Sequence, residues 1–304
     1  MKTKYVHLLI TVVLSILAYS AHTQGCSDAG FCTINSLKPK SSDGTLENKN
    51  QIKAGVSFGS AEESISIFGN YIEYNRQLSN SFGIDVKIAS LSQSGNGIST
   101  FGISDAYLTG NYQVNEQITL VLGTKIPLAD GNKKLDNIAL PMDYQSSLGT
   151  IDLILGLGLS VNKLQLALGY QQPLNQNKNE FLAEDYPLNS KIREFQSTNK
   201  FKRSGDALIR ISYPIALSGK LKLTPSLLPI YHLSKDKYTN MLGIESEIDG
   251  SEGLTFNGNV YLDYEINTMN ALQFNLGVPF VIRDVRPDGL TRSFVANLEY
   301  RIKF

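Results

Sequence analysis

Apolar and polar residues alternate along most of the chain after residue 50, and residues 292–304 show the pattern most clearly. A strand has a side-chain period of two, so this segment is predicted to be a strand with two unlike faces. Its apolar face consists of Phe294, Ala296, Leu298, Tyr300, Ile302 and Phe304. Such a strand belongs either to a soluble sheet packed on a core or to a membrane barrel, where the apolar face meets lipid and the polar face lines the lumen.

The same alternation recurs and predicts about twelve strands of barrel-like length. They span residues 51–59, 64–78, 82–89, 101–114, 116–128, 147–161, 164–171, 206–214, 220–232, 256–266, 272–280 and 292–304. Within 64–78 the register is ambiguous, with Ile72 and Tyr74 expected outward and Glu73 inward. Pro225 and Pro229 should weaken the pairing of their strand, because proline cannot donate to a ladder.

The connections between the predicted strands sort by length. Short links fall at 78–81, 113–116, 161–163, 216–219 and 267–270. The alternate links are long and polar at 129–146, 174–203 and 234–253, and shorter at 60–63, 92–100 and 283–291. Short periplasmic turns and longer extracellular loops are typical of outer-membrane barrels, whereas a soluble sandwich gives its loops no reason to sort in this way.

The predicted fold is therefore all-β, a transmembrane antiparallel up-and-down barrel of about twelve strands. An even number of strands puts both termini on the periplasmic side of the outer membrane of a diderm bacterium. The barrel should close by pairing the terminal strand, residues 292–304, with residues 51–59. No stretch after the amino-terminal signal is long and apolar enough for a transmembrane helix.

The amino terminus has the features of a secretory signal peptide, assigned here to residues 1–24. Lys2 and Lys4 precede an apolar run at 6–17, and Ala18-Tyr19-Ser20 gives the small-x-small pattern that precedes cleavage. The run is shorter than the ~20 residues that a membrane-spanning helix requires. We expect residues 25–50 to form a periplasmic segment, able to act as a plug, and residues 51–304 to form the barrel.

Two cysteines, Cys26 and Cys32, follow the predicted cleavage site. In an exported chain they most simply form a disulfide. A metal site or lipid attachment at Cys26 stays open as an alternative, although no histidine follows nearby and Thr23 stands where lipid attachment needs an apolar residue. No cofactor or metal is expected.

The charged side chains of the predicted strands fall mainly on the faces that are assigned inward. They are Lys53, Asp85, Lys87, Asp105, Lys125, Asp152, Lys163, Asp206, Arg210, Lys222, Asp263, Glu265, Glu299, Arg301 and Lys303. The candidate solute pathway is lined by Asp85, Lys87, Asp105, Lys125, Asp152, Arg210, Asp263, Glu265, Glu299 and Arg301. Both signs are interleaved, so the lumen is either salt-bridged and partly closed or hydrated and open to small solutes. The formal net charge of +0 and the lack of a basic block argue against nucleic acid as a partner.

Three stretches carry a family resemblance: residues 101–112 (FGISDAYLTGNY), 122–131 (LGTKIPLADG) and 147–160 (SLGTIDLILGLGLS). They resemble successive strands of the outer-membrane barrels grouped with the MetA pathway of phenol degradation, which are transporter-like. More distantly they are similar to the fatty-acid and aromatic-hydrocarbon uptake channels. Tyr300, Ile302 and Phe304 are similar to the carboxyl-terminal signal that the outer-membrane assembly machinery recognises. The resemblance implies architecture more than cargo.

The function predicted from these features is passive passage of small solutes, hydrophobic ones included, through a monomeric barrel that contacts outer-membrane lipid and the assembly machinery. A structural or surface-binding barrel is the alternative, with Phe181, Tyr186, Phe195 and Phe201 of the 174–203 loop as either contact residues or residues folded back on the mouth. An outer-membrane lipid hydrolase is the third class. His232 is the only histidine of the barrel region, and the sequence identifies no acid or amide partner for it and Ser234, so no enzyme is expected.

Overall fold

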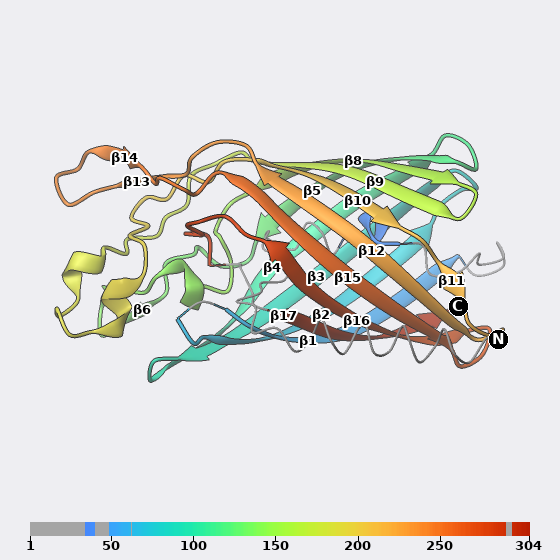
Figure 1. Ribbon diagram of the computed structural model, residues 1–304, viewed down its shortest axis with the longest axis horizontal. Coiled ribbons are helices and arrows are strands. Elements are labelled where there is room, and N and C mark those ends of the chain that lie inside the picture. Colours follow the sequence, from blue (N-terminus) through green and yellow to red (C-terminus); the bar gives the residue numbers. More distant parts are fainter. Residues whose placement is uncertain (1–33, 40–48, 62, 290–293) are drawn as a thin grey trace.

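The protein forms a closed antiparallel barrel in the computed structural model, which describes residues 34–39, 49–61, 63–289 and 294–304. Within these residues twelve long strands follow one another around the barrel, and each pairs with its two neighbours (Figure 1). The predicted fold class is confirmed. The proposed signal peptide at 1–24 and the pair Cys26 and Cys32 lie outside the described residues.

Twelve strands form the wall of the barrel. They are β1 (Asn50–Ser60), β2 (Ser66–Gln77), β3 (Phe82–Gly95), β4 (Ile98–Gln113), β5 (Ile118–Pro127), β8 (Asp152–Val161), β9 (Leu164–Pro173), β10 (Asp206–Ser212), β12 (Leu221–His232), β15 (Gly253–Glu265), β16 (Asn270–Val281) and β17 (Phe294–Lys303). A short strand, β11 (Ile215–Ala216), pairs with the start of β12.

The terminal strand β17 closes the barrel against β1, as predicted. Their ladder runs without interruption from Gln51 opposite Lys303 to Ser60 opposite Phe294. The weaker pairing predicted for β12 is present at Pro229 but not at Pro225. The ladder between β10 and β12 omits Ile209 and Arg210, which face Pro229 and its neighbour Leu228, whereas Pro225 stands in the continuous ladder with β15. Proline has no N–H to donate, so the gap follows from the residue type.

The outward face of the barrel is apolar and exposed. Examples are Ile72, Leu122, Phe101 and Phe274, with exposed fractions between 44% and 65%. The inward neighbours on the same strands, such as Glu73, are buried. A soluble protein would bury such a band, whereas lipid covers it in a membrane barrel. The outward assignment of Ile72 and the inward assignment of Glu73 are confirmed.

Two predicted boundaries are wrong. The link at 92–100 is mostly strand, because β3 and β4 extend into a hairpin whose turn is Asn96-Gly97, with φ values of 50° and 78°. The strand predicted to begin at residue 147 begins at Asp152 instead. Residues 147–151 turn across the end of the barrel, helped by Gly149 with φ of 68°.

A β-bulge in β4 was also missed. The register with β3 shifts between Ile88 and Ser90, and both Ser104 and Asp105 are buried. The residues before the bulge, Phe101 and Ile103, therefore face outward at odd positions, whereas Leu108 faces outward at an even one. A bulge reverses the alternation by one residue, which is why a single register could not describe this segment.

The connections lie at the two ends of the barrel according to their length (Figure 1). The short turns and the carboxyl terminus share one end. The long connections at the other end contain the hairpin of β6 (Lys134–Leu135) and β7 (Ile138–Ala139), the hairpin of β13 (Lys237–Thr239) and β14 (Glu245–Glu247), and the 3-10 helices η3 (Met142–Tyr144), η4 (Ala183–Asp185) and η5 (Lys191–Glu194). Among the described residues, no helix is long and apolar enough to cross a membrane. Below we call the two ends the turn end and the loop end.

Candidate functional site: the lumen and its two closures

A short segment of the amino-terminal region, residues 34–39, lies inside the lumen. It contains the 3-10 helix η2 (Asn35–Leu37), which contacts β8 and β9. Leu37 is 0% exposed and Ile34 3%. They join an apolar cluster on the inward faces of the wall, made of Tyr107, Ile154, Ala167, Leu208, Leu228 and Ile230. We call residues 34–39 the lumen segment and this wall cluster the apolar wall.

A glycine in the wall makes room for the lumen segment. A Cβ added at Gly156 would lie 2.9 Å from Leu37 Cδ2 and 3.0 Å from Val121 Cβ. A real Cβ atom almost never lies this close to a neighbouring heavy atom, so a larger residue would displace Leu37 or distort β8. Gly156 of β8 thus provides space for the lumen segment.

The opposite side of the lumen segment is polar and meets charges on β17, β1 and β2. Lys38 Nζ donates to Glu299 Oε2 at 3.1 Å and lies 5.5 Å from the centroid of the Tyr71 ring. Lys53 Nζ donates to Asn35 Oδ1 at 2.5 Å, and the Tyr71 hydroxyl donates to Glu299. The segment is therefore amphipathic across the lumen, with Leu37 on the apolar wall and Lys38 on a carboxylate.

The wall charges around the lumen segment form a connected network. Lys53 Nζ lies 2.8 Å from Glu73 Oε1, and Arg301 contacts both Glu299 at 2.5 Å and Asp263 at 3.0 Å. Asp85 accepts from Asn75 at 2.5 Å and from Asn111 at 2.6 Å, and Lys87 Nζ lies 4.4 Å from the centroid of the Tyr71 ring. We call this group, with Lys38, the charged belt. Pairing of this kind is what lets so many charges stay buried.

The predicted pathway residues all lie on inward faces, and all but the half-buried Glu265 are buried. The structure does not bring them together in one site. Lys125 pairs with Asp152 at 2.8 Å, Asp105 accepts from Ser147 at 2.6 Å, and Arg210 Nη1 donates to the Tyr261 hydroxyl at 2.5 Å. The inward assignment of Lys163 is wrong, because this residue is exposed in the turn between β8 and β9.

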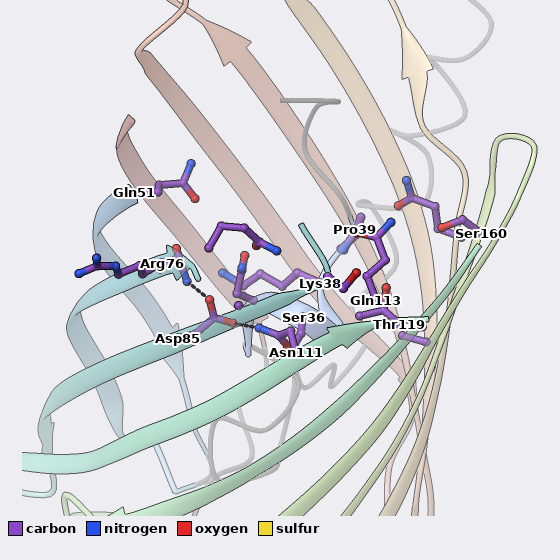
Figure 2. A pocket seen from close by; sticks show the side chains of 18 of the residues that line it. Ser36, Lys38, Pro39, Gln51, Arg76, Asp85, Asn111, Gln113, Thr119 and Ser160 are labelled. Carbon is purple, nitrogen blue, oxygen red and sulfur yellow. Dashed lines mark hydrogen bonds between the residues drawn. The ribbon is translucent and has the colours of Figure 1, made fainter. Parts of the chain in front are cut away.

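A polar cavity of about 460 Å³ opens on the turn-end side of the lumen segment (Figure 2). Ser36, Lys38 and Pro39 border it from the lumen segment, and Asp85 and Asn111 border it from the wall. The cavity is large enough for a small solute. We call it the vestibule.

The loop end is covered by two connections that fold inward. Every residue from Ala139 to Thr150 is buried. Gln93 Nε2 donates to the Gln145 carbonyl at 2.6 Å, and Thr100 Oγ1 donates to the Tyr144 carbonyl at 2.9 Å, which ties this stretch to the inward faces of β3 and β4. We call residues 139–150 the cap.

The aromatic residues of the 174–203 loop help to hold the cap. Phe181 is 0% exposed and packs with Phe195 and Tyr144 of the cap in one apolar cluster, and Tyr186 donates to the Ala139 carbonyl at 3.0 Å. Phe201 is also fully buried. Of the two interpretations of these aromatics, the structure shows residues folded back on the barrel mouth rather than presented to a partner.

Buried charges join the strand ends to the loops at this end. Arg203 contacts Asp206 at 2.5 Å and Asp288 at 3.2 Å, and Arg283 contacts Asp288 at 3.1 Å. Burial opposes ionisation of Asp288, but Arg283 and Arg203 outweigh it and hold the pKa of that carboxyl below its ordinary value. These ion pairs hold the connection between β9 and β10, residues 174–205, against the rim of the barrel.

His232 has two acid partners that the sequence did not identify. Its Nδ1 lies 2.6 Å from Asp206 Oδ1 and its Nε2 lies 2.8 Å from Asp236 Oδ1. Ser234 Oγ contacts Ser204 Oγ instead. Both ring nitrogens therefore face carboxylates, which leaves neither to take a proton from a serine hydroxyl. Among the described residues, no group of three or more His, Cys, Asp or Glu side chains has the arrangement of a metal site.

Comparison with known proteins identifies the fold. No protein-family model matches the chain, and no curated protein matches it. Among solved structures, the chain is similar to the COG4313 outer-membrane channel from Pseudomonas putida F1, with 14% identity, a TM-score of 0.57, and coverage of 88% of this chain and 100% of that chain. Weaker similarities include the CymD monoaromatic hydrocarbon channel (8% identity, TM-score 0.45, 92% and 94% covered) and the KdgM porin (10%, 0.44, 84% and 99%). The first similarity shows that the chain has the fold of an outer-membrane β-barrel channel; the two weaker ones add no argument.

Proposed function

We propose that the chain is a passive outer-membrane channel for small solutes, hydrophobic ones included, and that the amino-terminal segment 25–50 is its plug. One observation carries this proposal: the lumen segment borders a vestibule of about 460 Å³, which reaches the apolar wall at Ala167. Removing that segment would extend the vestibule along the apolar wall. The proposed cargo matches this wall, since Ile154, Leu208 and Leu228 face the lumen.

The lumen segment is held in a way that allows it to leave. Its backbone bonds are internal, with Leu37 N donating to the Ile34 carbonyl at 3.0 Å and Lys38 N donating to the same carbonyl at 3.1 Å. Its side chains contribute an ion pair, a hydrogen bond and the burial of Ile34 and Leu37. Full burial of a leucine or isoleucine is worth about 1.5–3 kcal/mol, so these two side chains hold the segment by about 3–6 kcal/mol, and release breaks no bond of the barrel ladders.

The remaining assignments belong to this proposal. Residues 1–24 direct export and are removed, Cys26 and Cys32 form a disulfide in the periplasmic segment, and both termini face the periplasm. Tyr300 and Ile302 are 38% exposed and Phe304 is 49% exposed on the outward face, where the assembly machinery can reach them. The ten pathway residues keep the lumen polar and hydrated once the plug has left.

Liposome swelling tests the proposal directly. The purified chain and a variant that lacks residues 26–49 are compared across sugars, amino acids and aromatic acids. We expect faster swelling for the deletion variant. The control is Leu242→Ser, a change between β13 and β14 at a side chain that is 82% exposed. The β13–β14 hairpin projects from the loop end, away from the lumen segment (Figure 1). Equal swelling of deletion and parent discards the plug, and no swelling of either discards the channel.

A closed structural barrel is the second candidate, and the paired charges favour it. Lys53, Lys125 and Arg301 each have a carboxylate partner within 3.0 Å, which is what a lumen that never opens would need. The hydrolase alternative has no comparable support, because His232 is engaged on both sides by aspartates.

A further inference from the structure

The lumen segment places an apolar side chain, Leu37, on the apolar wall and a cationic side chain, Lys38, on the charged belt. Leu37 occupies the apolar wall, with its side chain fully buried. Lys38 places its ammonium on Glu299, with the Tyr71 ring 5.5 Å away. The side chains of Lys38 and Glu299 are 6% and 0% exposed, so the pair is shielded from solvent. A solute that replaced the segment would meet the same two surfaces.

The sign of the solute follows from the charged belt. Its cations are Lys38, Lys53, Lys87 and Arg301, and its anions are Glu73, Asp85, Asp263 and Glu299. Lys222, opposite Asp263 on the neighbouring strand, also acts on this group. When Lys38 leaves, the belt loses one positive charge beside Glu299. Charges inside the lumen are screened less than charges at the open surface, so this loss favours a cationic replacement.

The local chemistry at Glu299 suits an ammonium group in particular. The carboxylate accepts from Lys38, from Arg301 Nε at 2.5 Å and from the Tyr71 hydroxyl. Loss of Lys38 would leave one acceptor position of Glu299 without its donor, beside an aromatic ring. A carboxylate next to a ring binds an ammonium through a charge-assisted hydrogen bond and a cation–π contact.

The geometry points to the binding of an amphiphilic amine, a compact apolar group that carries an ammonium, at the place where Leu37 and Lys38 sit. This inference rests on the proposed plug, because the site becomes accessible only when the lumen segment leaves. The lumen segment and the amine then compete for the same site in the barrel. Apolar amines would enter from the vestibule, whose border includes Lys38 and Asp85.

Isothermal titration with probes that share a six-carbon chain tests the inference. Hexylammonium, hexanol and hexanoate are titrated into the variant that lacks residues 26–49, with protein-free micelles as the blank. We expect hexylammonium to bind at least about tenfold more tightly than hexanol, the size of one charge-assisted hydrogen bond. Hexanoate should bind no better than hexanol. The full-length chain, whose plug fills the site, should bind hexylammonium at least about tenfold more weakly than the deletion variant.

Glu299→Gln in the deletion background should bring hexylammonium to the affinity of hexanol. Equal or tighter binding of hexanoate, or unchanged hexylammonium affinity in Glu299→Gln, overturns the inference. If Glu299→Gln fails to fold, the double variant Leu37→Ala, Lys38→Ala of the full-length chain replaces it. Hexylammonium should raise the melting temperature of this variant and hexanoate should not; no rise with hexylammonium, or an equal or larger rise with hexanoate, overturns the inference. Titration does not depend on flux, so its result is independent of the swelling assay.

Discussion

Leu37→Ala is predicted to open the channel more often without weakening the barrel. Leu37 is 0% exposed, belongs to the apolar cluster that contains Ile154 and Leu208, and lies beside Gly156. Truncating a buried leucine to alanine costs about 2–5 kcal/mol in well-packed cores. Here the cost falls on the equilibrium between the seated and the released plug. Because the wall can relax around a short segment, we use the lower end of that range.

A change of about 2 kcal/mol corresponds to about a 30-fold rise in the released population, at 1.4 kcal/mol per factor of ten. Single-channel recording in planar bilayers measures it as a higher frequency of openings. Leu242→Ala is the matched control, because it removes the same atoms from a side chain that is 82% exposed. Heat-modifiable mobility on a gel checks that both variants are folded barrels. If Leu37→Ala opens as rarely as the control, the lumen segment does not limit passage.

Three further changes test other contacts. Gly156→Val should also displace the lumen segment and make liposomes swell faster, since its Cβ would lie 2.9 Å from Leu37 Cδ2. Swelling no faster than that of the parent would contradict the close contact between Gly156 and Leu37. Deletion of Phe304 should lower the amount of folded protein in outer-membrane fractions, and normal insertion would count against a role in assembly. Arg203→Met should expose the 174–205 loop to limited proteolysis, because breaking one side of a buried pair costs about 3–5 kcal/mol; protection equal to that of the parent would show that Asp206 and Asp288 do not need this partner.

The barrel could be predicted from the sequence because a strand imposes one physical rule, the alternation of faces, on every residue in it. Glu73 lies inward and Ile72 outward for that reason, and the same rule placed Glu299 and Arg301 in the lumen. The rule fails where the chain departs from regular pairing. In β4 the extra residue at Ser104 reverses the faces, so Phe101 points outward from an odd position.

The closures of the lumen could not be predicted in the same way. Residues 34–39 have no periodicity, and Leu37 looks like one apolar residue in a polar linker; only the shape of the apolar wall around Gly156 shows why it is there. The partners of His232 were missed for a related reason. Asp206 reaches it from the neighbouring strand β10, and Asp236 reaches it from the loop that follows β12. Such pairings depend on register and loop path rather than on spacing.

The cap is predicted to loosen as pH rises from about 4 to about 7. Asp143 lies in the cap and is buried, and burial raises the pKa of its carboxyl to about 7, with Asp288 and Glu63 adding to the rise. In a lifted cap the carboxyl meets water and its pKa returns to about 3.9. Below about pH 4 the group is protonated in both states and does not influence the cap.

Between these values only the lifted cap releases the proton, so each pH unit favours lifting by about 1.4 kcal/mol and the effect reaches about 4 kcal/mol at most. Above about pH 7 the group is ionised in both states and the bias is constant. Hydrogen exchange of residues 139–150 between pH 4 and pH 8, corrected for intrinsic exchange rates, measures the opening. Asp143→Asn keeps the shape of the side chain and removes the titration, so its corrected opening should be flatter with pH than that of the parent. A parent and variant with the same slope would mean that another group, such as Glu63 or His232, controls the cap. In that case the burial of Asp143 would contribute to the packing of the mouth but not to its response to pH.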